Sequence, residues 1–146
     1  MKYLTLKTKY YFNNKKKIFL IDANNKILGR LCSQIIKLIM GKNSPKYTPN
    51  NSFTNKIIII NAKKIKVDYN KFKNKIYYKY TGYIGNKKQY TMYNLFKKNP
   101  SILIKKSIYR MLPKNLLGKY VKKNIFIFNN SNHNFNIKIK KIKILK

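Results

Sequence analysis

Apolar residues along the chain form two kinds of pattern. Three runs are apolar at every position, at residues 18–21, 57–60 and 125–128. Short continuous runs of Ile, Leu and Phe are typical of strands that are covered on both faces. Between these runs, apolar residues recur at helical spacing. The alternation of strands with helices favours a parallel sheet layered with helices.

The clearest helical pattern runs from Leu28 to Met40. Its apolar residues fall on one stripe, with positions separated by three or four residues. They are Leu28, Leu31, Cys32, Ile35, Ile36 and Ile39. Gly41 suits the position after the last helical residue, and Pro45 follows where the helix has ended. Cys32 lies inside the stripe, so we interpret it as a small core residue rather than a nucleophile.

The second half of the chain predicts three more helices. The first begins near Thr91, a suitable N-cap, and ends before Pro100, which suits the first turn of the next helix. That second helix runs to about Met111, where Pro113 ends it, and a third covers residues 115–123. The side chains expected on the apolar faces of the last two are Ile104, Ile108, Met111, Leu112, Leu116, Leu117, Tyr120 and Val121.

Residues 71–88 are predicted to form a long loop in which lysines alternate with aromatic residues. Lysines can contact phosphates, aromatic rings can stack on unpaired bases, and Gly82 and Gly85 let backbone approach RNA closely. In the alternative interpretation, some tyrosines pack on the sheet and the lysines are only solvated. The combined pattern favours RNA contact.

The charge balance also indicates a nucleic-acid partner. The chain has 35 Lys and Arg but only two carboxylate side chains, Asp22 and Asp68, and its net charge is +33. Such a chain repels itself, so we expect a polyanionic partner. Nucleic acid fits better than a membrane, because the basic residues run the whole length instead of flanking one apolar element. A genome rich in A and T could inflate the lysine count, but it explains the missing carboxylates less well.

Signals for enzyme chemistry are weak. Asp22 and Asp68 lie in separate segments, so a pair of carboxylates for acid–base catalysis is not expected. One Cys and one His cannot supply the four ligands of a structural zinc site. Asp22 closes the first strand, and we expect it to accept hydrogen bonds from the turn that follows. No apolar stretch reaches the 18 residues of a membrane span. We therefore predict no enzyme, metal, cofactor, small-molecule substrate or membrane partner.

Several short motifs occur in a characteristic order between residues 18 and 135. They are Ile21-Asp22-Ala23, Leu28-Gly29-Arg30-Leu31, Gly41-Lys42, Tyr47-Thr48-Pro49, Asn61-Ala62, Lys75-Ile76-Tyr77-Tyr78, Thr81-Gly82-Tyr83 with Gly85, Met111-Leu112-Pro113-Lys114-Asn115 with Leu117-Gly118, and His133. Each motif is weak alone. In this order and spacing they resemble the bacterial-type large-ribosomal-subunit protein thirteen family.

The chain departs from the family pattern at several positions. Ser52-Phe53-Thr54-Asn55 stands where the family usually has Asp-x-Gly-Asp. Tyr80 replaces a His, Ile84 a Pro, Arg110 a Gly, and Phe135 a second His. Loss of carboxylates beside an RNA reduces repulsion, so these changes are compatible with the resemblance and affect only individual RNA contacts.

The resemblance implies a fold and a function. The fold would be a three-layer α/β/α arrangement with a four-stranded, mostly parallel sheet and basic loops. It would occupy residues 18–136, between a basic extension (1–17) and a Lys-rich tail (137–146) that forms an edge strand or an extended arm. The function would be that of a structural constituent of the large ribosomal subunit. It would bind and stabilise large-subunit ribosomal RNA during assembly and in translation, beside neighbouring ribosomal proteins. The expected location is the ribosome of an organelle (mitochondrion or plastid), with the bacterial cytoplasm as the alternative.

The residues expected to contact RNA lie in basic loops and on one helix face. Arg30 stands on the polar face of the first helix, where its guanidinium can form a bidentate contact with a phosphate. The whole set is Arg30, Lys42, Lys46, Tyr47, Lys79, Thr81, Tyr83, Lys87, Lys88, Lys114 and His133. For His133, a capped turn is an equally good interpretation. A general nucleic-acid compaction protein and an RNA-modifying enzyme are the rival functions, and neither accounts for the ordered motifs.

Overall fold

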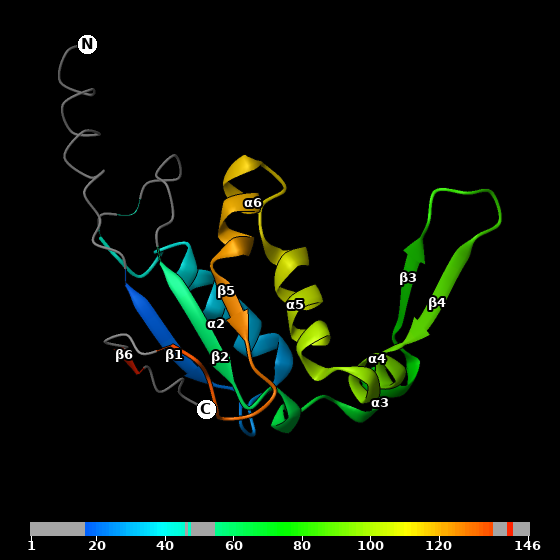
Figure 1. Cartoon of the computed structure of the whole chain (residues 1–146), viewed down its shortest axis with the longest axis horizontal. Coiled ribbons are helices and arrows are strands. Elements are labelled where there is room, and N and C mark those ends of the chain that lie inside the picture. Colours follow the sequence, from blue (N-terminus) through cyan, green and yellow to red (C-terminus); the bar gives the residue numbers. More distant parts are fainter. Residues whose placement is uncertain (1–16, 46, 48–54, 136–139, 142–146) are drawn as a thin grey trace, which may run out of the picture.

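The computed structural model describes residues 17–45, 47, 55–135 and 140–141 (Figure 1). In chain order, the elements are β1 (Ile18–Asp22), α2 (Leu28–Ile39), β2 (Lys56–Ile60), the 3-10 turn η1 (Ala62–Lys64), α3 (Tyr69–Asn74), β3 (Ile76–Tyr80), β4 (Lys87–Thr91), α4 (Met92–Lys98), α5 (Pro100–Met111), α6 (Leu116–Lys123), β5 (Ile125–Ile127) and β6 (Lys140–Lys141). The α/β class predicted from the sequence is confirmed.

A parallel sheet in the order β5-β2-β1-β6 forms the centre of the molecule. Ile57 of β2 pairs with Phe19 of β1 on one side and with Ile125 of β5 on the other. The three apolar runs are thus the three main strands, as predicted. The fourth, β6, pairs only two residues with β1. The rest of the 137–146 tail lies outside the described residues.

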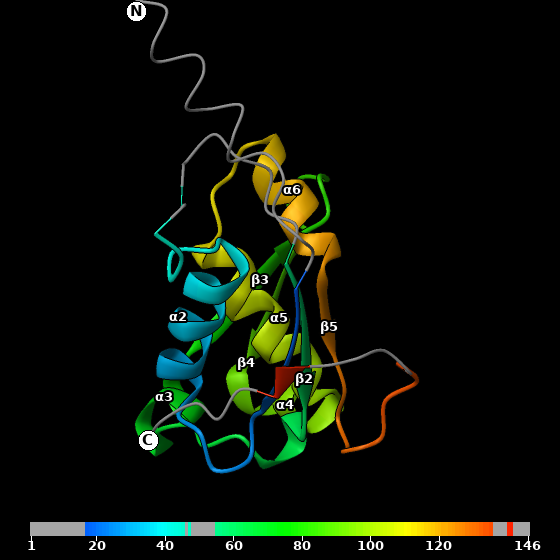
Figure 2. The ribbon, with the colours of Figure 1, turned by 90° about the vertical axis from the view of Figure 1, so that its left-hand side faces the viewer.

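Helices α2 and α5 cover one face of this sheet (Figures 1 and 2). Because side chains alternate along a strand, Ile21, Ile57 and Ile59 all point to this face, and all are fully buried. All six residues of the predicted α2 stripe are buried against them. Burying each such side chain stabilises the fold by roughly 1.5–3 kcal/mol. The result is a rigid platform from which the loops extend.

The opposite face of the sheet is contacted by the C-terminal segment. Phe126 alternates to this side, and its ring lies 4.9 Å from that of Phe135, which also contacts Phe128 at 6.1 Å. The expected α/β/α arrangement has a second layer of helices on this face. In the described part of the chain, the segment with Phe135 lies on this face instead.

The expectation that residues 71–88 form one long loop is wrong. This region contains part of α3 and an antiparallel hairpin of β3 and β4, in which Tyr78 pairs with Gln89 and Tyr80 with Lys87. The hairpin projects from the molecule beside α3 and α4 (Figure 1). At its base, Phe72 of α3 makes edge contacts with the rings of Tyr93 and Phe96 of α4, at 5.5 and 5.3 Å.

The predicted helices α4 and α5 are confirmed, together with their caps. Thr91 accepts a hydrogen bond from the Asn94 N–H at 3.2 Å, and Pro100 occupies the first turn of α5. Three side chains expected in the core are exposed instead, namely Met111, Leu116 and Tyr120. Leu116 and Tyr120 are exposed because α6 is short and buries only a narrow stripe, which consists of Gly118 and Val121.

Candidate nucleic-acid interface

The structure distributes the predicted RNA-contact residues over three places (Figure 1). The hairpin carries Lys79, Thr81, Tyr83, Lys87 and Lys88. The turn after α2 and the loop before α6, which hold Lys42, Tyr47 and Lys114, lie at the upper end of the molecule in Figure 1. The first turn of α2 and the segment after β5, which hold Arg30 and His133, lie at the lower end. Lys46 lies outside the described residues. Among the described residues, the hairpin gathers the largest group of the predicted positions.

The outer face of the hairpin combines aromatic rings with positive charge. Residues 76, 78 and 80 share this face with residues 87, 89 and 91 of the other strand, because directly paired residues point the same way. Tyr78 and Tyr80 are exposed, and Nζ of Lys87 lies 4.2 Å from the centroid of the Tyr78 ring. Exposed rings flanked by lysines suit stacking on unpaired bases with phosphate contacts alongside.

The tip of the hairpin is apolar and fully open. Gly82 and Gly85 adopt φ values of +96° and +77°, which other L-residues rarely adopt. Tyr83 is exposed, and so is the whole side chain of Ile84. Thr81 donates a long hydrogen bond from Oγ1 to the Asn86 carbonyl, at 3.4 Å. The two glycines therefore allow a tight tip that presents Tyr83 and Ile84 outward.

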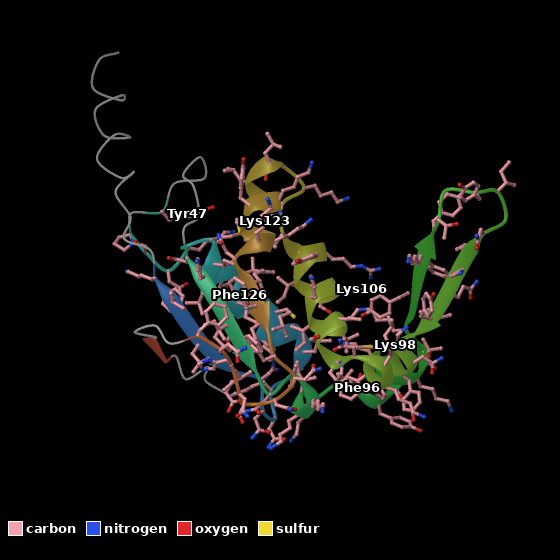
Figure 3. All side chains as sticks on the ribbon, viewed as in Figure 1. Tyr47, Phe96, Lys98, Lys106, Lys123 and Phe126 are labelled. Carbon is pink, nitrogen blue, oxygen red and sulfur yellow. The ribbon has the colours of Figure 1, made fainter. Side chains whose placement is uncertain are left out.

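The other face of the hairpin is turned toward α5. Lys79 stands directly opposite Lys88 on this face, next to Tyr77, which is 1% exposed. Burial raises the pKa of the Tyr77 hydroxyl, while Ser107 and the charge of Arg110 act in the opposite direction. Lys106 and Arg110 of α5 lie over the Tyr77 ring, and Figure 3 shows the side chain of Lys106 on α5. Neither residue is among those predicted from the sequence, although their separation of four places them on one helix face.

At the upper end, the turn after α2 fixes the backbone of Lys42. The N–H of Gly41 donates to the Leu38 carbonyl at 3.1 Å, and that of Lys42 donates to Lys37 at 2.9 Å. With Gly41 at a φ of +71°, this is a Schellman ending, and Gly41 takes the position after the helix that the sequence predicts. Lys42 and Lys114 are exposed and Tyr47 is half-buried. Lys42 and Lys114 add cationic positions well separated from the hairpin.

At the lower end, the turn after β1 is organised by Asp22. Its Oδ1 accepts hydrogen bonds from the Asn24 N–H and from Nδ2 of Asn61, both at 2.9 Å. The predicted structural role of Asp22 is thus confirmed. Arg30 is exposed on α2, and the His133 ring is half-buried with its centroid 6.3 Å from that of Phe128. His133 therefore packs beside Phe128, the residue that directly follows β5, in addition to any contact it makes outside the chain.

Comparison with known proteins decides the family. The profile of the family described as "Ribosomal protein L13" matches residues 16–134. A protein of Buchnera aphidicola (Cinara cedri) named "Large ribosomal subunit protein uL13" is 48% identical over 120 residues, 82% of this chain and 84% of that protein. Proteins of the same name from Vesicomyosocius okutanii and Mycoplasmopsis synoviae are 45% and 40% identical, over 82–83% of this chain and 84% of theirs. The chain belongs to the ribosomal protein L13 family.

Membership of the L13 family confirms the resemblance drawn from the ordered motifs. It also confirms that the chain is not an enzyme, because the family consists of structural ribosomal proteins. In the part of the chain that the structure describes, no helix is long and apolar enough to cross a membrane. Nor do three or more His, Cys, Asp or Glu side chains gather there around a common point.

Gly118 fixes the loop that carries Lys114 in this L13-family chain. A Cβ on Gly118 would overlap the carbonyl oxygen of Pro113, so we expect Gly118→Ala to destabilise the fold by about 1–3 kcal/mol. Gly29→Ala is the matched control, because a Cβ there meets no atom within 4 Å and the site is helical. We expect it to stabilise by about 0.4–1 kcal/mol. Urea denaturation measures both, and a neutral Gly118→Ala would contradict the close approach.

The buried thiol of Cys32 makes the free energy of unfolding depend on pH. Burial raises the pKa of its thiol from 9.0 to about 12. Because the folded state holds this proton more tightly than the unfolded state, the contribution is complete below pH 9 and is lost as the pH rises toward 12. We therefore expect the free energy of unfolding to fall between pH 8 and pH 10 more steeply in the wild type than in Cys32→Ala. Equal falls in urea denaturation would show that the thiol does not contribute.

Proposed function

We propose that this chain is a structural component of the large ribosomal subunit that binds and stabilises large-subunit ribosomal RNA. The observation that carries the proposal is the 40–48% identity to proteins named "Large ribosomal subunit protein uL13", extending over most of both chains. The net charge of +33 supports it, because a polyanionic partner relieves the repulsion among positive charges that so few carboxylates leave unbalanced.

The proposed mechanism divides the molecule into a platform and contact elements. The apolar sheet with α2 and α5 forms a rigid platform, since its central residues are fully buried. The hairpin and the basic positions at the two ends would neutralise phosphates of RNA segments that are far apart in sequence. If roughly eight phosphates are neutralised, log affinity falls with log salt with a slope of about −7, from the rule for duplex DNA.

The proposed partners and compartment are inferred from the related proteins. Neighbouring large-subunit proteins are proposed as further partners, because ribosomal proteins of this kind share an RNA scaffold. The relatives reported above are bacterial, which favours a bacterial-type ribosome over the organellar ribosome expected from the composition.

Competition binding tests the proposal against its main rival. The purified full chain is bound to labelled large-subunit ribosomal RNA from a bacterium and challenged, in separate reactions, with three unlabelled competitors: the same large-subunit RNA, small-subunit ribosomal RNA and random duplex DNA. We expect large-subunit RNA to be at least tenfold the better competitor by mass of nucleotide. Equal competition by all three would support a general compaction protein and contradict the ribosomal role.

A further inference from the structure

Three cationic side chains converge on one buried ring between the base of the hairpin and α5. Nζ of Lys75 lies 5.7 Å from the centroid of the Tyr77 ring, Nζ of Lys106 lies 5.2 Å from it, and Cζ of Arg110 lies 5.0 Å from it. Lys75 directly precedes β3, whereas Lys106 and Arg110 stand one helical turn apart on α5. The Tyr77 ring thus has positive charges from the hairpin base and from α5 close to its centroid.

These charges have no carboxylate among them to balance their repulsion. The two acidic side chains of the chain lie elsewhere, with Asp22 bonded in the turn after β1 and Asp68 at the opposite end of α3 from Lys75. All three cationic groups lie close to the same ring centroid. Their mutual distances are therefore comparable to the Debye length of about 8 Å, so salt screens their repulsion only in part. An anion placed among them would relieve this repulsion.

The cluster continues outward along the hairpin. Lys79 shares the α5-facing side with Tyr77 and stands directly opposite Lys88, an arrangement that destabilises a hairpin when nothing lies between the charges. From residue 75 to residue 79 the strand advances about 13 Å, which is longer than a single phosphate group. A row of this length fits successive phosphates of one strand better than an isolated anion.

We propose that Lys75, Lys106 and Arg110, seated on Tyr77, bind one backbone phosphate of ribosomal RNA, and that Lys79 and Lys88 contact the phosphates next to it. The guanidinium of Arg110 supplies a planar pair of donors for two phosphate oxygens, and the two lysines add charge. The proposal rests on the proposed function and deepens it by naming the α5-facing side of the hairpin as the backbone-binding side. The outer face with Tyr78 and Tyr80 is then left for bases.

Two double variants test the site in the full chain. Lys106→Gln with Arg110→Gln removes two charges from the ring. Lys105→Gln with Lys119→Gln removes two exposed charges that lie away from Tyr77, on α5 and α6. With large-subunit ribosomal RNA from a bacterium as the probe, we expect the first pair to lower affinity at least tenfold more than the second. We also expect it to reduce the salt slope by about two. Thermal melting of both variants verifies that they fold.

Lysine acylation with mass spectrometry gives a second readout on the unaltered chain. We expect Lys75 and Lys106 to be protected in the RNA complex, and Lys105 to stay as reactive as in the free protein. If RNA binds but both double variants lose affinity equally and Lys106 stays reactive, the site is overturned while the proposed function stands. If polyglutamate protects Lys75 and Lys106 as well as RNA does, the occupant is an acidic protein segment and the RNA assignment is overturned. If the wild type binds no ribosomal RNA, the proposed function itself fails.

Discussion

Replacing Lys79, Lys87 and Lys88 together by Gln is expected to lower the affinity for large-subunit ribosomal RNA about 100-fold at 0.1 M salt. The salt slope should fall by about 2.7, from about 0.9 per lost phosphate contact. The fold should survive, because all three side chains are exposed and removing the opposed pair of Lys79 and Lys88 relieves repulsion. Filter binding across a salt series, with thermal melting alongside, measures both effects.

The matched control removes three exposed lysines from another part of the surface. Lys63, Lys64 and Lys66 lie in or beside η1, and replacing their side chains leaves the backbone hydrogen bonds of Lys64 and Lys66 intact. We expect the triple Gln variant at these positions to lose less than tenfold in affinity. If the two triple variants lose affinity equally, binding follows total charge, and the hairpin has no special part in it.

Ile59→Ala is expected to produce the largest loss of stability. Ile59 is fully buried on β2, which pairs with strands on both sides. Truncation of such a side chain costs about 2–5 kcal/mol, a large share of the roughly 5–15 kcal/mol that holds a typical domain folded. Urea denaturation measures the loss. Because the side chain is remote from the hairpin, RNA affinity corrected for the folded fraction should not change.

Ile59→Val provides the graded comparison for the same site. It removes one methylene and should cost about 0.5–1.5 kcal/mol. A loss in Ile59→Ala no greater than in Ile59→Val would mean that the site collapses around the truncation, which is incompatible with a rigid platform. A change in corrected RNA affinity would mean that the sheet and the RNA-contacting elements are coupled.

The platform could be predicted from the sequence because burial leaves a periodic signal. The runs that became β1, β2 and β5 are apolar at every position, and the stripe of α2 matches its buried residues. Helix α5 was predicted with its boundaries because Pro100 suits the first turn and Pro113 ends the helix, and the structure adds Asn99 as its N-cap. The apolar periodicity and the residues that start and stop helices are local features of the chain, so one sequence was sufficient to predict these elements.

The hairpin could not be predicted in the same way. In β3, only Tyr77 is buried, and the strands are held by pairing with each other rather than by a hydrophobic face. Alternation of Lys with aromatic residues therefore resembled a basic loop. The cationic cluster around Tyr77 could not be predicted for another reason. Lys75 lies near Lys106 and Arg110 only in the folded chain, where the base of the hairpin packs beside α5. The one available signal was Arg110, which stands where the family usually has Gly.

The most direct test of the central claim is sedimentation of a lysate of the source cells in a magnesium-containing gradient, with the chain traced by mass spectrometry. The account predicts that the chain migrates with the large ribosomal subunit and stays there through a moderate salt wash, because many phosphate contacts and a rigid platform hold it. Migration at the top of the gradient, or with DNA, would contradict a built-in ribosomal role.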